Sequence, residues 1–153
     1  MFNFKVRVLT DDDWDSVFEL LRPWYDEGHW SEASEFSPEN GVAFVSDMLE
    51  YSDCIGCFDG SELVGLVCCD VSYNARVRPD CFITRLYSSP HVRGSGVSRL
   101  LVEAALLHAR SRNCVSVYAA NLTNFSDRDN TLHDNLFKKY GFGVVSNNLR
   151  KVL

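Results

Sequence analysis

The chain has 153 residues, of which 46% are hydrophobic and 24% are charged, and these proportions predict one globular domain spanning residues 1–153. No apolar run reaches the ~18–20 residues that a membrane-spanning helix needs. Residues 1–9 alternate apolar and polar side chains and do not form a signal peptide, so we expect a cytoplasmic protein. The net charge of -6 argues against a general nucleic-acid-binding protein, which needs a basic surface.

The charges are unevenly distributed along the chain. Residues 11–53 contain thirteen acidic side chains and one basic side chain, Arg22, whereas residues 54–153 contain twelve basic and eight acidic ones. The first segment should therefore repel anions, and the second should tolerate them. A solvated acidic helix face would explain the first segment equally well.

Six cysteines occur in the sequence, at positions 54, 57, 68, 69, 81 and 114. Cys54 and Cys57 have the spacing of a metal knuckle, but no second pair follows at the distance of a zinc site. Cys68, Cys69, Cys81 and Cys114 lie in apolar, strand-like runs, where a free cysteine packs as a small hydrophobic residue. We expect reduced structural cysteines and no bound metal.

The first third of the chain predicts a strand and two helices. Alternation over 4–9 predicts the strand, and Thr10 is a capping residue for a helix that is expected to end at Pro23. Residues 24–37 mix aromatic residues, acids and a glycine without a clear period, which predicts a loop or a short irregular helix. A second helix is expected from Pro38 to about Tyr51.

From Cys54 onward the pattern changes to short strands and two further helices. The expected strands cover 54–58, 63–71, 81–87 and 115–119, with a last one beginning at Gly141, and the expected helices run from the turn at 94–98 to about Arg112 and over 131–140. The complete order is β-α-α-β-β-β-α-β-α-β. The sequence thus predicts an α/β protein, with a mixed α+β arrangement of helices around one sheet.

The segment 86–98, LYSSPHVRGSGVS, passes from a strand through a proline and a glycine-rich turn into a helix. Glycines let the backbone approach a ligand, and the first N–H groups of a helix are free donors. The turn is therefore suited to a phosphate or pyrophosphate, with Arg93 and Arg99 as candidate charged contacts. It lacks the Gly-Lys-Ser/Thr ending of an NTP-binding loop and the third glycine of a dinucleotide fingerprint.

This segment resembles the acyl-CoA pyrophosphate motif of the GCN5-related N-acetyltransferase family. The matching positions are Leu86, Tyr87, Pro90, Arg93, Gly94, Gly96 and Val97. The sequence LFKKYGF at 136–142 resembles the end of the last helix in that family. The resemblance is specific over 81–142 and only topological over 1–60. It implies the GNAT acyl-CoA N-acyltransferase fold and acetyl-CoA as cosubstrate.

The resemblance also implies where coenzyme A lies. Its pantetheine arm would enter a V-shaped opening between the fourth and fifth strands, which separate at a bulge, and the turn would hold the pyrophosphate. The implied cofactor-binding residues are Leu86, Tyr87, Ser88, Arg93, Gly94, Ser95, Gly96, Val97, Ser98 and Phe137. The acceptor amine would enter from the side built by the first two helices and their loop.

That side coincides with the acidic segment, so we expect a small cationic amine as the acceptor, such as a polyamine or an aminoglycoside-like compound. Aromatic and acidic side chains there could supply cation–π and ionic contacts. The candidate substrate-binding residues are Trp24, Tyr25, Asp26, Glu27 and Trp30. Aromatic residues that simply cap the core are an equal alternative.

The sequence departs from the family pattern at positions that bear on the mechanism. Ser98 replaces the last small Gly or Ala of the turn, which should preserve binding. Phe137 stands where many relatives carry a tyrosine that protonates the departing thiolate, so Tyr140 and Tyr87 are the candidate acids. The strand at 82–85 offers no carboxylate where relatives often place a general base. The candidates for that role are Glu27, Asp70, Asp80 and His133.

We expect direct attack of a neutral amine on the acetyl carbonyl in a ternary complex. A missing acid or base costs about 10²–10⁴-fold in rate, whereas orientation of the reactants contributes about 7–11 kcal/mol. The departures should therefore slow an enzyme without silencing it. Two alternatives stay open: acetylation of a protein N-terminus or lysine, and a non-catalytic acyl-CoA-binding sensor. A monomer or homodimer is expected, with no nucleic-acid or membrane partner.

Overall fold

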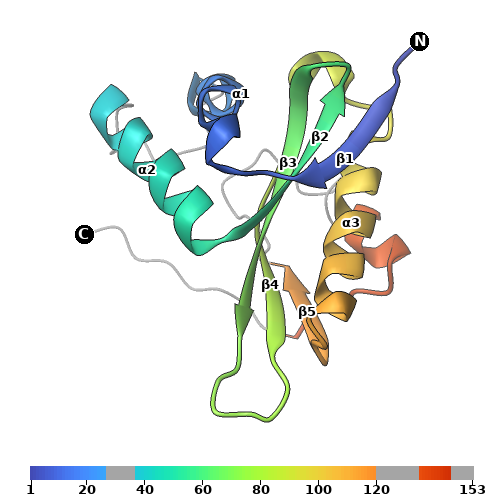
Figure 1. Ribbon diagram of the computed structural model, residues 1–153. Coiled ribbons are helices and arrows are strands. Elements are labelled where there is room, and N and C mark those ends of the chain that lie inside the picture. The colour runs from blue at the N-terminus through green and yellow to red at the C-terminus, as the bar shows by residue number, and fades with distance from the viewer. Residues whose placement is uncertain (27–36, 120–134, 146–153) are drawn as a thin grey trace. The chain divides into compact units, whose positions relative to one another are not determined.

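The computed structural model describes residues 1–26, 37–119 and 135–145, and the chain forms two compact units, Met1–Ala120 and Asn121–Leu153. The first unit is a five-stranded sheet in the order β1-β2-β3-β4-β5. Helices α1 and α2 cover one face of this sheet, and α3 covers the other (Figure 1). Among the helices of the described residues, none is long and apolar enough to cross a membrane.

The elements of the first unit follow the predicted order as far as the fifth strand. They are β1 (Phe4–Val8), the 3-10 turn η1 (Asp11–Asp13), α1 (Trp14–Asp26), α2 (Pro38–Tyr51), β2 (Asp53–Asp59), β3 (Glu62–Ser72), β4 (Asp80–Ser88), the 3-10 turn η2 (Pro90–Val92), α3 (Val97–Ser111) and β5 (Ser116–Ala119). β4 pairs with β5 in parallel, and all other neighbours are antiparallel. The predicted mixed α/β class is confirmed.

The first helix differs from its prediction at its C-terminal end. Thr10, the expected capping residue, forms a capping box with Asp13, and the Thr10 N–H donates to the Asp13 carboxylate at 2.9 Å. Pro23 was expected to end the helix, but it lies inside α1, which continues to Asp26. A proline removes its own N–H from the helix, but this one is exposed within the last turn, so only one backbone bond is lost there.

The face of the sheet under α1 and α2 holds the main apolar cluster. Ser37 caps α2 by accepting a hydrogen bond from the Asn40 N–H at 3.3 Å, and Pro38 occupies its first turn. The cluster joins both helices to the sheet through Leu9, Val17, Leu20, Leu21, Val45, Met48, Cys54, Phe58, Leu63, Leu66, Cys68 and Tyr87. Side chains of β4 that share this face with Tyr87 therefore point toward α1 and α2.

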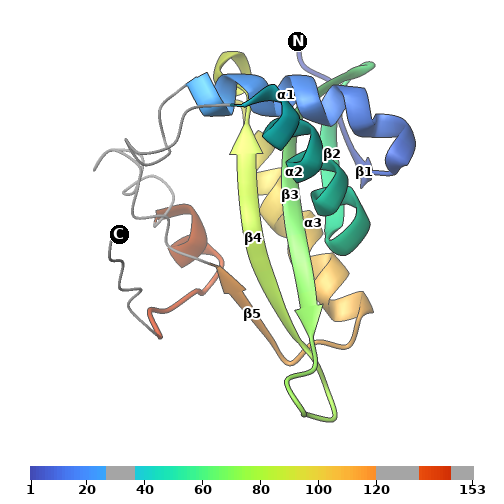
Figure 2. The ribbon, with the colours of Figure 1, turned by 90° about the vertical axis from the view of Figure 1, so that its left-hand side faces the viewer.

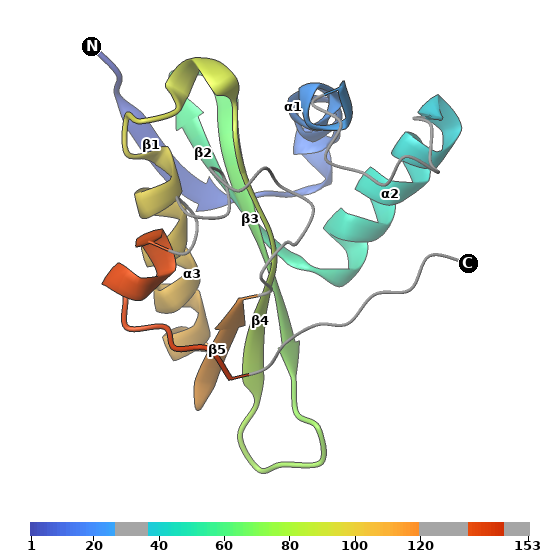
Figure 3. The same cartoon turned by 180° about the vertical axis from the view of Figure 1, so that it is seen from behind.

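On the other face, α3 packs against the sheet (Figure 3). Its first turn comes close to β3 at Gly65. A Cβ on Gly65 would lie 2.7 Å from Val97 Cγ1 and 2.9 Å from the Tyr87 carbonyl oxygen, which is too close for any side chain. The absence of a side chain at Gly65 thus lets the first turn of α3 sit directly against the strands. Val97 and Leu101 are fully buried in this contact.

β4 loses its partner on one side halfway along its length. Cys69 lies opposite Ile83 and Cys68 opposite Arg85, which leaves Thr84 as an extra residue on β4. The last described pair of β4 with β5 is Ile83 with Ala119, where the described part of β5 ends (Figure 2). Within the described residues, 84–88 therefore has β3 on one edge and no strand on the other. The bulge agrees with the one that the resemblance implied, whereas the chain beyond Ala119 lies outside the described residues.

In the second unit, the described residues 135–139 are helical, and Gly141 ends the helix with a φ of +82°. The Phe142 N–H donates to the Phe137 carbonyl at 3.2 Å, and the Gly141 N–H donates to the Lys138 carbonyl at 3.0 Å. The rings of Phe137 and Phe142 meet edge to face at 5.1 Å. These are the bonds and the apolar contact of a Schellman cap, which accounts for much of the LFKKYGF pattern. Residues 142–145 form no strand, and the rest of the predicted last strand lies outside the described residues.

Candidate functional site

The turn between β4 and α3 is a compact, glycine-dependent structure. Ser89 extends the strand pairing by donating its N–H to the Val64 carbonyl at 2.9 Å, and η2 follows. Gly94 and Gly96 have φ values of +83° and +100°, which favour glycine. A Cβ built on either would meet no atom within 4 Å, so both positions border open space.

The start of α3 leaves backbone donors available at this turn. The first helical bond runs from the Leu100 N–H to the Gly96 carbonyl at 3.1 Å. The N–H groups of residues 96–99 precede it and have no partner within the helix, and no side chain caps Gly96. The first turn also contains no acidic residue. These donors and the positive end of the helix dipole suit the turn to an anion.

Three polar side chains tie this turn to the end of β4. The hydroxyl groups of Ser88 and Ser98 lie 3.4 Å apart, within hydrogen-bonding distance. Arg93 donates from Nε to the Ser88 carbonyl at 3.3 Å, and its guanidinium lies 5.8 Å from the centre of the Tyr87 ring. Ser98, which departs from the family pattern, thus links strand and helix. The turn is positioned by β4 itself.

The predicted cofactor-binding residues of the first unit lie together, but they differ in what they can offer. The side chains of Leu86, Tyr87 and Val97 are at least nine-tenths buried, so these residues can offer only backbone groups to a ligand on the open edge of β4. Ser88 and Ser98 contribute hydroxyl groups, and the two glycines contribute backbone. Phe137 and Tyr140 lie in the second unit.

The predicted catalytic and substrate-binding residues are only partly covered by the described residues. Glu27, Trp30 and His133 lie outside the described residues. Residues 24–26 form the last turn of α1. Of the remaining candidate carboxylates, Asp70 is on β3 and lies opposite Phe82 of β4. Asp80 is buried at the start of β4, 3.5 Å from the Arg76 guanidinium. It lies eight residues, or about 26 Å, from Ser88, the end of β4 that leads to the glycine-rich turn.

Part of the acidic segment is neutralised by local partners. The Arg7 guanidinium hydrogen-bonds Asp13 at 2.6 and 2.7 Å. This contact, helped by the Thr10 N–H, lowers the pKa of Asp13 to about 2. Asp53 lies 2.8 Å from His108 and 3.2 Å from Arg112, both on the α3 side. The acidic excess facing α1 and α2 is therefore smaller than the residue count indicates.

The prediction of buried cysteines is confirmed for five of the six thiols, whereas Cys114 is partly exposed. Cys54 and Cys68 lie opposite each other on β2 and β3, with their Sγ atoms 3.0 Å apart. The hydrogen bond to Cys54 and burial both raise the pKa of Cys68. No group of three or more metal-ligating side chains occurs among the described residues.

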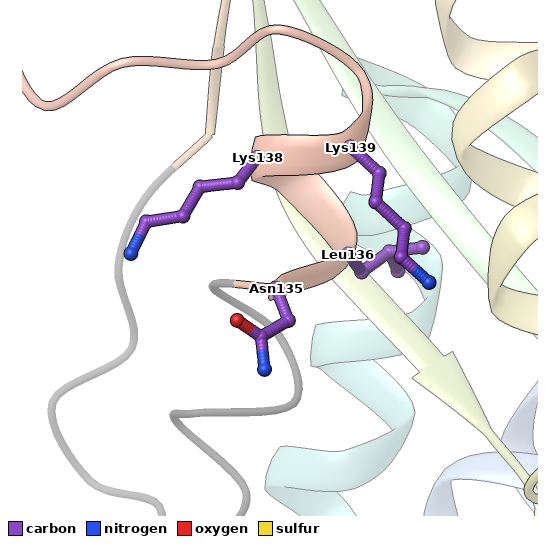
Figure 4. A pocket seen from close by; sticks show the side chains of 4 residues that line it. All are labelled: Asn135, Leu136, Lys138 and Lys139. Atoms are coloured by element: carbon purple, nitrogen blue, oxygen red, sulfur yellow. The ribbon is translucent and has the colours of Figure 1, made fainter.

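A shallow depression on the second unit is lined by Asn135, Leu136, Lys138 and Lys139. Figure 4 shows the two lysine side chains extending in different directions from the short helix. None of the predicted cofactor-binding residues lines it.

Sequence reasoning overlooked Arg85, which lies on the α1 and α2 face of β4. Its guanidinium is 4.6 Å from the centre of the Phe44 ring on α2. Alternation along the strand relates Arg85 to Tyr87, two positions later, and places both on one face. That alternation was the available signal, but the contact of Arg85 with Phe44 on α2 is a tertiary feature that the sequence does not reveal.

A mixed sheet flanked by helices on both faces, with free backbone donors where α3 begins after β4, defines an α/β protein whose glycine-rich turn is suited to an anionic group. The chain belongs to the acetyltransferase (GNAT) family, because the model of that family matches residues 14–142. The resemblance inferred from the glycine-rich turn and the last helix is thereby confirmed.

Solved structures of low sequence identity share this fold. An acetyltransferase from Trypanosoma brucei is 22% identical with a TM-score of 0.70, and the match covers 99% of this chain and all of the other. A transcriptional regulator from Bacillus halodurans is 16% identical, with a TM-score of 0.76 and coverage of 99% and 100%. An aminoglycoside N-acetyltransferase in complex with CoA is 13% identical, with a TM-score of 0.74 and coverage of 100% and 96%. No curated protein matches the chain.

Proposed function

We propose that residues 1–153 form one acetyl-CoA-dependent N-acetyltransferase domain that acts on a primary amine of a small cationic molecule. The observation that carries this proposal is the turn at 94–98, where the first backbone N–H groups of α3 have no partner within the helix and no acidic residue occupies its first turn. Membership of the acetyltransferase family supports the reaction class. The acceptor class rests on the acidic segment and on physical reasoning.

The turn fits the diphosphate of coenzyme A. Two glycines bordering open space give a charged group access to the backbone, and the N–H groups of residues 96–99 are oriented by the helix. Arg93 is held at the edge of the turn by Ser88. Within the described residues no strand pairs with the second edge of β4 at 84–88, and the amide groups of a pantetheine arm would supply both donors and acceptors to that edge.

The transfer itself requires little from side chains. The amine nitrogen forms a bond to the acetyl carbon, the carbon–sulfur bond breaks, the nitrogen loses a proton, and the thiolate takes one up. A backbone N–H on the open edge of β4 is placed to polarise the acetyl carbonyl. A free thiol has a pKa of about 8.5, so the thiolate is a tolerable leaving group at neutral pH. Phe137 in place of a tyrosine therefore slows the step without preventing it. Tyr140 is the alternative acid that we propose, because the side chain of Tyr87, the other sequence candidate, is buried in the apolar cluster.

The acceptor side is proposed to include Trp24, Tyr25, Asp26, Glu27 and Trp30, with Glu27 as the general base. Its acidic character favours a cationic molecule, because clefts lined by one sign of charge concentrate ligands of the opposite sign. Aminoglycoside N-acetyltransferases are among the proteins that share the fold. The proposal takes the same general class of acceptor, an amine of a small cationic compound.

The test is thiol release from acetyl-CoA in the presence of a panel of small amines and peptides, between pH 6 and 9. We expect release with small primary amines and loss of release in a Gly96→Trp variant. Release with peptides alone would replace this acceptor class with protein acetylation. Binding of acetyl-CoA without release from any amine would contradict an enzymatic role and favour an acyl-CoA sensor, the function that Phe137 also suggests.

A further inference from the structure

β4 carries a cationic side chain on the face that the acceptor is proposed to approach. After the bulge at Thr84, Arg85 and Tyr87 are two positions apart, so their side chains share one face. Tyr87 belongs to the apolar cluster under α1 and α2. The Arg85 guanidinium lies over the Phe44 ring on α2, 4.6 Å from the ring centre. Arg85 therefore stands beside the open half of β4, next to the proposed position of the acetyl group.

The charge of Arg85 has no carboxylate partner within the part of the chain that the structure describes. Other described arginines do pair with carboxylates, namely Arg7, Arg22, Arg76 and Arg112. Arg85 is half-buried and contacts an aromatic ring instead. A guanidinium held against a ring keeps the N–H donors along its edge available, in the planar geometry that binds a carboxylate through two hydrogen bonds.

A cation at this position restricts which amines can react. An ammonium group that approaches Arg85 alone is repelled, so a purely cationic acceptor gains nothing from it. An acceptor that also carries a carboxylate gains a charge-assisted contact and a fixed orientation. The same positive charge lowers the pKa of the bound ammonium, which raises the fraction of neutral, nucleophilic amine.

We propose that Arg85 binds a carboxylate of the acceptor, and that the acceptor is a small amino acid-like molecule with more than one amine, as in a diamino acid. This inference rests on the proposed function and narrows its acceptor class. The second amine of such an acceptor keeps its net charge positive, as the acidic segment favours, while its carboxylate pairs with Arg85. Phe44 acts as a positioning residue, because the guanidinium lies over its ring.

The experiment uses acceptors that differ only in the carboxylate, measured with acetyl-CoA and the full chain. Lysine is compared with cadaverine, and ornithine with putrescine. The variants are Arg85→Gln, which removes the charge, and Arg85→Lys, which keeps the charge and loses the planar fork. Arg110→Gln removes one positive charge from an exposed position of α3 and serves as the matched control.

We expect the wild type to prefer the amino acid of each pair by about 10-fold or more in kcat/KM, as expected for a charge-assisted pair. Arg85→Gln should lower kcat/KM for the amino acid about 10–100-fold and leave the diamine nearly unchanged, whereas Arg110→Gln should leave the preference intact. If Arg85→Gln does not fold, Arg85→Lys should still reduce the preference. A wild type that uses the diamines equally well, or a preference that survives in the Arg85 variants, overturns the inference while leaving the proposed function standing.

The two proposals fail in distinguishable ways. If acetyl-CoA binds and no amine releases thiol, the proposed activity is wrong. Calorimetric titration of lysine and of cadaverine into the CoA-loaded protein then decides the role of Arg85. Stronger binding of lysine that Arg85→Gln abolishes supports the inference, and equal or absent binding of both overturns it.

Discussion

A bulky side chain at Gly96 should abolish coenzyme A binding while leaving the fold in place. Gly96 has a φ of +100°, and a Cβ there would meet no atom within 4 Å. The side chain of Gly96→Trp would therefore project into the open space that the diphosphate is proposed to occupy, without clashing with the protein. Gly60, in the turn between β2 and β3, offers a matched control because its φ is +60° and it is equally unobstructed.

The two substitutions carry similar backbone strain. A non-glycine residue in the left-handed region costs about 1–2 kcal/mol, which lowers the melting temperature by about 2–8 °C for a chain of this size. The effects on binding should differ. Each hydrogen bond from a backbone N–H to a charged phosphate contributes about 1.5–3 kcal/mol, so loss of two such bonds at the start of α3 weakens binding by about 10²–10⁴-fold.

Isothermal titration of coenzyme A into the wild type, Gly60→Trp and Gly96→Trp measures this difference, with thermal unfolding of each protein as the control for folding. We expect both variants to lose similar stability and only Gly96→Trp to lose affinity. Unchanged affinity in a folded Gly96→Trp protein would refute the assignment of the turn as the diphosphate site. Equal loss of affinity in both variants would show that the effect is global.

Three further predictions follow from the packing and the electrostatics. Gly65→Ala places a methyl group 2.7 Å from Val97 Cγ1, so it should destabilise the protein by about 1–3 kcal/mol and weaken coenzyme A binding by displacing the start of α3. Asp13 has a folded pKa of about 2 against its ordinary 3.8, so its contact with Arg7 stabilises the fold above about pH 4 and is lost as the pH falls through 2. Because the Arg7 side chain is 52% exposed, we expect Asp13→Asn to lower the free energy of unfolding by only about 1–2 kcal/mol at pH 7 and by almost nothing at pH 2. Urea unfolding at both pH values measures this difference, and an equal cost at both would contradict the ion pair. Thiol titration at pH 8 should find Cys114 reacting much faster than the five buried cysteines, and rapid reaction of several thiols in folded protein would contradict their burial.

Much of the fold could be predicted because local chemistry determines it. Ser37 and Pro38 mark the start of α2 by capping chemistry, and Gly60 marks the hairpin turn because it adopts a positive φ. The glycine-rich turn was recognisable for the same reason, since its backbone favours glycine at two positions of positive φ. The Schellman cap at Gly141 explains why the last helix carries a recognisable pattern.

The features that the sequence did not predict depend on tertiary structure. Pro23 stays within α1, because an exposed proline in the last turn removes a single backbone bond. The bulge at Thr84 is defined by the register of β4 against β3, and no local signal marks it. Arg85 was missed for that reason. Likewise, the charge count of residues 11–53 could not reveal that Asp53 pairs with α3 on the opposite face.

The central claim is that backbone amides at the start of α3 hold the diphosphate of coenzyme A. The most direct measurement is a ¹⁵N–¹H titration that follows the amide signals of residues 94–99, with Gly60 as the internal reference. We predict saturable downfield shifts of several of these amides on addition of coenzyme A, reproduced by adenosine 3′,5′-diphosphate only in part, and no shift at Gly60. Coenzyme A that binds without shifting the amides of Gly96 and its neighbours, or that does not bind at all, would contradict the account.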